Sequence, residues 1–123
     1  MQRVHVNDTR ELLETAARRG TTVSFPQLFS LFSEDDKPSD VYNALEAACV
    51  EICDWKTAIY SVLLAKKDSG LPGDGFFDIF RNHLADSYRE ISGGMHVAGL
   101  DPLQRRKMTE LERHRVYFHA KSL

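Results

Sequence analysis

The sequence predicts an α+β, mostly helical fold, in which a winged-helix-like head with a short small sheet is followed by two C-terminal helices. Three observations support this class. Amphipathic stretches with apolar residues three and four positions apart dominate the chain. One apolar stretch, Trp55 to Lys67, has the character of a strand. The 123 residues, 42% hydrophobic and 28% charged, suit one winged-helix-like domain spanning residues 1–123.

The head is predicted from residues 8 to 54. Asp8-Thr9-Arg10-Glu11 has the pattern of a capping box, so the first helix is expected to begin there. Gly20 suits the left-handed position that ends a helix. The next expected elements, in order, are a strand of two or three residues within 21–25, a helix over 27–32 with Pro26 in its first turn, and a helix over 40–54 capped by Ser39.

The stretch from Trp55 to Lys67 is predicted to be the main strand. Both of its alternating sets of side chains are mostly apolar, which is typical of a strand covered on both faces. Pro72-Gly73 then predicts a type II turn, because glycine accepts the positive φ that the third turn position needs. Asp74 is expected to cap the helix that follows.

Two helices are predicted after this turn. The first, from Gly75 to Ile91, has the strongest helical period in the chain and ends at Ser92-Gly93-Gly94. The second begins with Asp101 as its N-cap and Pro102 in its first turn. The order helix, strand, helix, helix, strand is that of a winged-helix head, in which the turn and helix replace the second wing strand.

These segments resemble a family of small winged-helix-like proteins of prophages and other mobile elements, which are uncharacterised. The resemblance rests on Arg19-Gly20 and Thr22-Val23 in the head, on Tyr60 to Leu64, and on the turn Pro72-Gly73-Asp74-Gly75-Phe76-Phe77. The chain departs from the family at residues 25–29, where Phe-Pro-Gln-Leu-Phe replaces the usual Tyr-x-Glu-Leu-Ala. The resemblance implies a fold and no activity.

The charge distribution argues against DNA reading by the helix over 40–54. Residues 21–54 carry a net charge of −6, and this helix offers Asn43 alone for reading base edges. We therefore hypothesise a non-enzymatic interaction or regulatory module that binds a protein partner, of basic character, through this acidic helix. The candidate partner-binding residues are Tyr42, Asn43, Glu46, Glu51 and Asp54.

The alternative hypothesis is a nucleic-acid-binding regulator that uses the basic C-terminal helix. Residues 100–123 carry a net charge of +3, and the candidate contacts are Arg105, Arg106, Lys107 and Arg113. The simpler interpretation, which we favour, is that these residues form a solvated face and pair with acids.

No catalytic, metal or cofactor site is predicted. Cys49 and Cys53 lie one helical turn apart without a second pair of ligands, so they are interpreted as small core residues. An enzyme whose site is assembled from distant residues is a third hypothesis. Without a signal peptide or a membrane-length apolar run, a cytoplasmic protein is expected. The sequence makes no prediction of oligomeric state.

Overall fold

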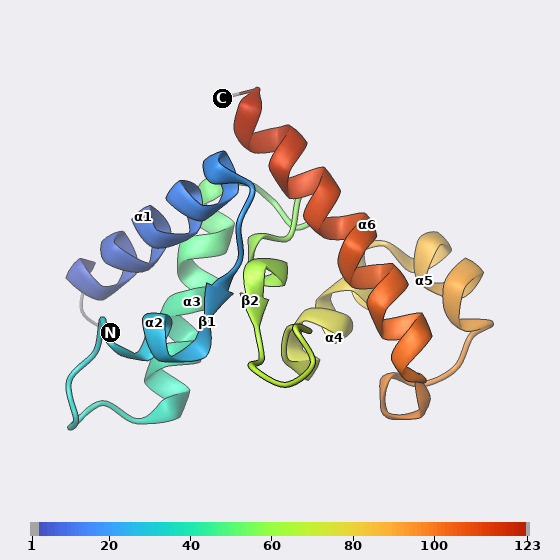
Figure 1. The fold of residues 1–123 in the computed structure, drawn as a ribbon, viewed down its shortest axis with the longest axis horizontal. Helices are drawn as coiled ribbons and strands as arrows, with labels where there is room; N and C mark the ends of the chain where they lie inside the picture. The colour runs from blue at the N-terminus through green and yellow to red at the C-terminus, as the bar shows by residue number, and fades with distance from the viewer. Residues whose placement is uncertain (1–2, 123) are drawn as a thin grey trace.

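Helices dominate this computed structural model, which describes residues 3–122, and a two-stranded parallel sheet lies near its centre (Figure 1). The predicted α+β, mostly helical class is confirmed. Two short 3-10 helices, η1 and η2, complete the set of elements. In chain order the elements are α1 (Arg3–Arg19), β1 (Val23–Ser24), α2 (Phe25–Phe29), α3 (Pro38–Ile52), η1 (Tyr60–Leu63), β2 (Leu64–Ala65), α4 (Asp74–His83), α5 (Ala85–Ser92), η2 (Val97–Gly99) and α6 (Pro102–Lys121).

Helix α1 begins five residues before the predicted capping box, so the expected start at Asp8 is wrong. Its buried face starts at Val6 and continues through Thr9 and Leu13, at the spacing of one helical side. Thr9 lies inside the helix, where its hydroxyl donates to the His5 carbonyl oxygen at 2.7 Å. Gly20 ends the helix with a φ of 67°, as predicted.

Helix α3 begins at Pro38, two residues before the predicted start at Asp40, and its N-cap is Lys37 and not Ser39. Pro38 occupies the first turn, and the Asp40 carboxylate accepts from the Lys37 N–H at 3.0 Å. The helix ends at Ile52, two residues before the predicted end at Asp54. Its buried face has the three- and four-residue spacing of an amphipathic helix and consists of Val41, Ala44, Leu45, Ala48 and Cys49.

The predicted strand from Trp55 to Lys67 is wrong over most of its length. Only Leu64–Ala65 is a strand, and Tyr60–Leu63 is a 3-10 helix. The strand forms where β1 can pair with it, in parallel, with Val23 opposite Leu64 and Ser24 opposite Ala65. Residues 58–64 are nevertheless buried, because η1 packs against α1, α3 and α6. Burial on every side therefore explains the apolar alternation that resembled a strand.

The predicted type II turn at Pro72-Gly73 is also wrong. Gly73 has a φ of −72°, and Gly70 supplies the left-handed conformation instead, with a φ of 72°. The Gly70 N–H donates to the Lys66 carbonyl at 2.8 Å, and the Lys66 N–H donates to the Leu71 carbonyl at 2.9 Å. Asp74 is the first residue of α4, and Gly73 takes the cap position predicted for Asp74.

The single helix predicted over 75–91 is two helices, α4 and α5, separated at Leu84. Leu84 has a φ of −127° and a ψ of 54°, which no helix contains. Because the chain bends at Leu84, α4 and α5 can run in different directions. Each buries an aromatic side chain, Phe80 in α4 and Tyr88 in α5. The predicted end of α5 at Gly93 and the predicted start of α6 at Asp101-Pro102 are confirmed.

The sheet in residues 3–122 is a parallel pair, without a hairpin. The winged-helix-like interpretation therefore stays a prediction. None of the helices described in this part of the chain combines the length and the apolar composition that a membrane span requires.

Candidate functional site

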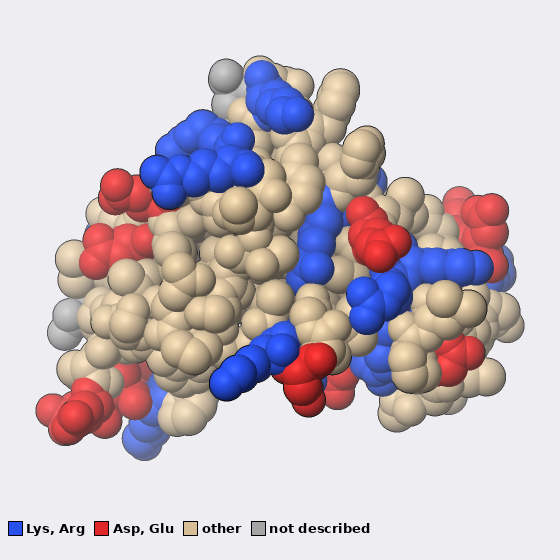
Figure 2. All heavy atoms as spheres, viewed as in Figure 1, with Lys and Arg blue, Asp and Glu red and all other residues tan. Residues whose placement is uncertain are grey.

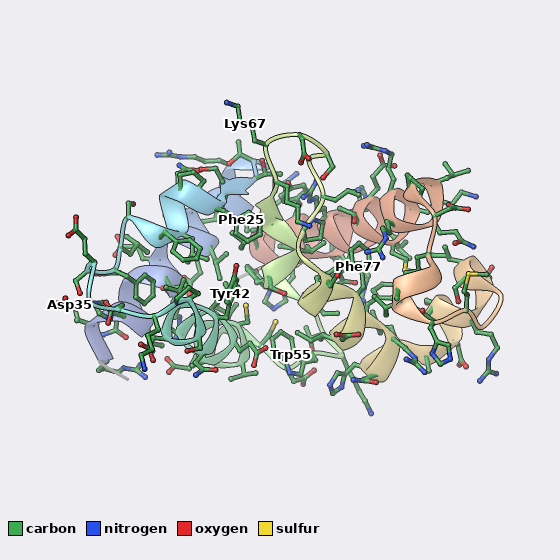
Figure 3. The ribbon with its side chains drawn as sticks, turned by 90° about the horizontal axis from the view of Figure 1, so that it is seen from below. Phe25, Asp35, Tyr42, Trp55, Lys67 and Phe77 are labelled. Atoms are coloured by element: carbon green, nitrogen blue, oxygen red, sulfur yellow. The ribbon has the colours of Figure 1, made fainter. Side chains whose placement is uncertain are left out.

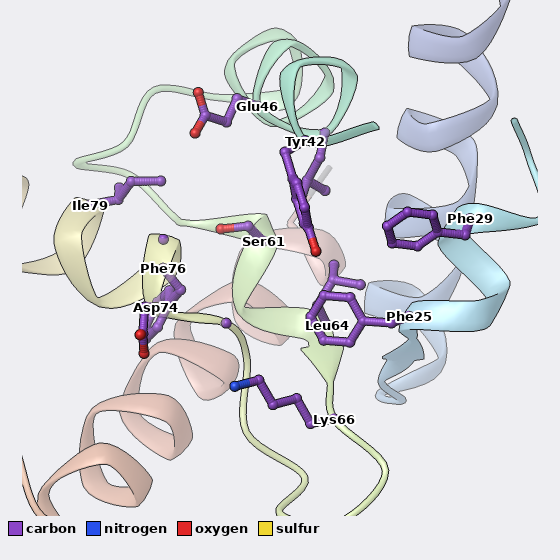
Figure 4. A pocket seen from close by; sticks show the side chains of 13 residues that line it. Phe25, Phe29, Tyr42, Glu46, Ser61, Leu64, Lys66, Asp74, Phe76 and Ile79 are labelled. Atoms are coloured by element: carbon purple, nitrogen blue, oxygen red, sulfur yellow. The ribbon is translucent and has the colours of Figure 1, made fainter. Parts of the chain in front are cut away.

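A pocket of about 660 Å³ opens between α3 and α4 (Figure 4). Helices α2 and α3 form one side, α4 forms the other, and η1 with β2 forms the floor. Its volume lies in the range of small-molecule sites. The lining residues are Phe25, Phe29, Tyr42, Leu45, Glu46, Ser61, Leu64, Lys66, Gly73, Asp74, Gly75, Phe76 and Ile79.

One wall of the pocket is aromatic. The reciprocal bonds between Ser24 and Gln27 begin α2 directly after β1, which places Phe25 and Phe29 on the pocket side. The Phe29 ring meets the Tyr42 ring edge-on, with centroids 6.0 Å apart. Figure 4 shows the Tyr42 hydroxyl pointing down toward Leu64 and Phe25.

The floor carries a buried hydroxyl without a partner. Ser61 is 7% exposed, and within residues 3–122 its Oγ is the one buried side-chain nitrogen or oxygen that makes no hydrogen bond. Leaving such a group unsatisfied costs roughly 1–3 kcal/mol, and native folds contain few such groups. Because Ser61 lines the pocket, a bound group is one physical explanation of its position.

Charged groups stand at the rim. Lys66 and the first turn of α4 lie on the lower side in Figure 4, and Glu46 lies across the opening from them. The Asp74 carboxylate accepts from Arg105 Nη1 at 2.9 Å, so a cation of α6 already compensates its charge. Phe25, Ser61 and Lys66 were not among the predicted site residues, because only the fold brings them to one cavity.

The five predicted partner-binding residues lie in three different places in the structure. Tyr42 and Glu46 meet at the pocket, and Asn43 is exposed beside them. Glu51 faces α1 instead, where it pairs with Arg3 and Arg10, and these arginines lower its pKa. Glu51 therefore lies on another side of α3 than Asn43 and Glu46, and its role in partner binding stays a prediction.

The fifth predicted residue, Asp54, lies beyond the end of α3. Its carboxylate accepts from the Thr57 N–H at 2.9 Å and from the Thr57 hydroxyl at 3.1 Å. These bonds lower the Asp54 pKa. The residue is exposed, and it stabilises a turn at the end of the helix.

The four residues predicted to bind nucleic acid differ in their exposure. Arg105 is 19% exposed; it pairs with Asp74, donates to the Leu100 and Val97 carbonyls, and lies over the Phe77 ring. Arg113 donates to three backbone carbonyls and is half-buried. Only Arg106 and Lys107 are exposed. In Figure 2 an acidic side chain interrupts the basic side chains over α6.

Three residues of α6 instead hold the irregular segment before β2. Glu112 is fully buried and accepts from the Ile59 N–H at 2.8 Å and from Arg115 at 2.6 Å. Arg115 also donates to the Lys56 and Thr57 carbonyls. Sequence analysis missed this role of Glu112, although its spacing of four from Met108 and from Val116 places it on the core face of the helix.

The cysteines behave as core residues. Cys49 is buried, which raises the pKa of its thiol, and the Cys53 thiol donates to the Ala58 carbonyl at 3.3 Å. Across residues 3–122 no three potential metal ligands come together.

Comparison with known proteins identifies no relative: no protein-family model, no curated protein and no solved structure matches this chain. The resemblance to mobile-element proteins therefore stays a prediction.

Proposed function

We propose that this protein is a non-enzymatic interaction module that binds a basic protein partner through the outer face of α3. The observation that carries the proposal is a row of exposed residues along that face. Asn43, Glu46 and Val50 follow one another at three- and four-residue spacing, and Tyr42 stands beside them.

This face combines apolar and acidic groups, as a specific binding surface does. Val50 is 50% exposed and Tyr42 is 43% exposed, and both are large enough to anchor an interface. The exposed acid Glu46 lies on the same face, and Lys37 is the single basic residue between positions 21 and 54. A partner with basic side chains around an apolar residue complements this arrangement.

The order of elements supports a winged-helix-like head. The order α1, β1, α2, α3 and β2, with η1 before β2, is compatible with such a head, in which α3 would be the recognition helix. Carboxylates on this helix repel phosphates, which favours a protein over DNA as the partner. The nucleic-acid alternative keeps two exposed contacts, Arg106 and Lys107.

Site-specific crosslinking in cells tests the proposal. A photo-reactive amino acid in place of Asn43 should capture one basic protein, and the same group in place of Glu90, on the exposed side of α5, should not. The captured protein is then purified and its affinity measured. Glu46→Lys combined with Val50→Asp should weaken binding by about tenfold or more, because both the charge attraction and the apolar contact are lost.

Glu90→Lys is the matched charge control and should leave the affinity unchanged. The proposal is wrong if position 43 captures nucleic acid, or if it captures nothing while other surface positions crosslink. It is equally wrong if the purified partner binds the double variant as tightly as the parent protein.

A further inference from the structure

We propose that the pocket between α3 and α4 binds a small molecule that has an apolar body and a single carboxylate. The ligand class is an apolar monocarboxylic acid. The cavity shares Tyr42 and Glu46 with the outer face of α3, whereas Ser61, Leu64 and Lys66 line the cavity and are not part of that face. Variants of Ser61 and Lys66 therefore test this inference separately from the protein partner. It rests on three features of the pocket: its walls, its floor and the charges at its rim.

The walls provide the contact for an apolar body. Phe25 and Phe29 on one side face Phe76 and Ile79 on the other, and Leu64 lies on the floor between them (Figure 4). A single protein side chain would leave most of a cavity of about 660 Å³ unfilled, whereas a small molecule occupies such a volume. Burying the apolar surface of the ligand against these side chains supplies the main driving force.

The floor points to a ligand independently. Ser61 is more than nine-tenths buried, with 7% of its surface exposed. Its hydroxyl lines the pocket and has no hydrogen-bond partner among residues 3–122. In Figure 4 this hydroxyl is directed toward the space beside Phe76 and Ile79. A ligand oxygen there would accept a hydrogen bond from the Ser61 hydroxyl, or donate one to it if the oxygen carries a hydrogen. The Ser61 hydroxyl would then have the hydrogen bond that it lacks within residues 3–122.

The rim selects the charge of the ligand. Lys66 and the N-terminal turn of α4, a helix of ten residues, lie on the same side of the opening. Helix N-termini attract anions because their first N–H groups have no partner within the helix. Asp74 belongs to this turn, but Arg105 pairs with it at 2.9 Å, so the remaining charge on that side is positive.

Glu46 limits the ligand to one anionic group. It lies across the opening from Lys66, where a second carboxylate would be repelled (Figure 4). A ligand amine would find Glu46 attractive and Lys66 repulsive. The competing ligand class is therefore an apolar amine, and the experiment below distinguishes the two.

Three probes of one shape test the charge preference: phenylbutyrate, phenylbutanol and phenylbutylamine. Their affinities are measured by titrating isotope-labelled protein and following the backbone amide NMR signals of Ser61, Leu64 and Gly75. The acid should bind about tenfold more tightly than the amine, because only the acid forms charge-assisted bonds at the Lys66 side. Equal binding by acid and amine, tighter binding by the amine, or shifts located outside the pocket would overturn the proposal.

Two neighbouring lysines supply a matched pair of variants. Lys66 lines the pocket, whereas Lys67 points into solvent at the tip of its loop (Figure 3). Lys66→Gln should weaken the acid about fivefold to tenfold and leave the alcohol unchanged. Lys67→Gln should change neither. If both variants weaken the acid equally, the effect is one of overall charge and the site is refuted.

Ser61→Ala separates a binding role from a structural one. Because the hydroxyl makes no hydrogen bond to any of residues 3–122, removing it should leave thermal stability equal or higher. The same change should weaken phenylbutyrate severalfold. A variant that loses stability but not affinity would assign Ser61 to the fold and remove it from the site. Binding of the protein partner is measured on Lys66→Gln and Ser61→Ala as well, because neither variant changes α3. Unchanged partner affinity shows that the α3 surface functions independently of the pocket.

Discussion

Side chains of α6 form hydrogen bonds with buried backbone groups that a neighbouring strand would bind in a sheet. The segment before β2 is buried, and buried backbone groups need hydrogen-bond partners. Arg113 donates to the carbonyls of Val62, Leu64 and Gly70 at 2.9, 3.1 and 2.8 Å, and Glu112 accepts from the Ile59 N–H. Arg113, one of the residues that suggested nucleic-acid binding, is therefore half-buried and serves the fold.

Arg113→Met should destabilise the protein by about 3 kcal/mol, because it leaves buried carbonyls without donors. The measurement is chemical denaturation followed by circular dichroism. Arg106→Met is the control, since Arg106 is exposed on the same helix and makes one long bond of 3.4 Å to the Ser69 carbonyl. Equal losses in the two variants would show that helix charge, and not carbonyl pairing, sets the effect.

Glu112 gives the stability a distinctive pH dependence. Burial raises its pKa above the ordinary 4.5, against the opposing effect of the Ile59 N–H and Arg115. The folded state then holds the Glu112 proton to a higher pH than the unfolded chain does. This residue alone therefore makes the free energy of unfolding fall as the pH rises from 4.5 through the raised pKa, and Glu112→Gln should remove that contribution.

The test is to measure the free energy of unfolding of both proteins from about pH 4 to about pH 7, the range around the ordinary pKa of a glutamate. Relative to the variant, the parent protein should lose stability with rising pH. Parallel curves would mean that the pKa of Glu112 is not raised. A steeper loss in the variant would reverse the sign of the argument.

At the scale of elements, the connection from β2 to α4 determines where the pocket wall stands. Gly70 turns the chain with a φ of 72°, and the backbone bonds of Lys66 with Gly70 and with Leu71 close the loop. Helix α4 then begins immediately after Gly73, next to the floor of the pocket. The turn therefore positions both Lys66 and the start of α4.

Two glycines in this region should respond oppositely to alanine. Gly70→Ala should destabilise the protein by about 1 kcal/mol, because a side chain strains the left-handed conformation. Gly75 lies in the first turn of α4 with open space where a Cβ would stand, so Gly75→Ala should stabilise by about 0.5 kcal/mol. Thermal unfolding of the two variants measures both signs, and a loss of stability in Gly75→Ala would contradict the helical assignment there.

At the scale of the whole molecule, residues 58–64 connect the two ends of the chain. Helices α1 and α3 contact η1 from the N-terminal part and α6 contacts it from the C-terminal part. In Figure 1, β2 and the short helix before it lie between α3 on the left and α6 on the right. The buried residues of this segment, among them Ile59, Tyr60 and Leu63, belong to the main hydrophobic core. Unfolding of this segment should therefore require unfolding of the whole.

Native-state hydrogen exchange tests this cooperativity. The Ile59 amide bonds to Glu112 and the Val62 amide bonds to the Ile59 carbonyl at 3.1 Å, so both should exchange only through global unfolding. Their protection should match that of Cys53, whose amide bonds to the Cys49 carbonyl in the core helix α3. Amides of the exposed loop at Glu34 and Asp35 should exchange much faster. Early exchange at Ile59 would show an independently opening segment.

Local interactions allowed part of the fold to be predicted from the sequence. The buried stripe of α3, the helix ends at Gly20 and Gly93, and the Asp101-Pro102 start of α6 each depend on residues within a turn or two of one another. Tyr42 and Glu46 were also identified as candidate site residues, because helical spacing places them on one face. Such features follow from spacing and capping chemistry alone.

The tertiary structure decided what depends on distant residues. The bonds that hold residues 56–63 in a path other than the predicted strand join positions about fifty apart in the chain, as from Arg113 to Val62 and from Glu112 to Ile59. The pocket likewise collects Phe25, Ser61 and Lys66 from three elements. Periodicity reports that a segment is buried, but not which neighbours bury it or supply its hydrogen bonds. The sequence by itself therefore determined the helices and their buried faces, and packing decided the path of the central segment and the site beside it.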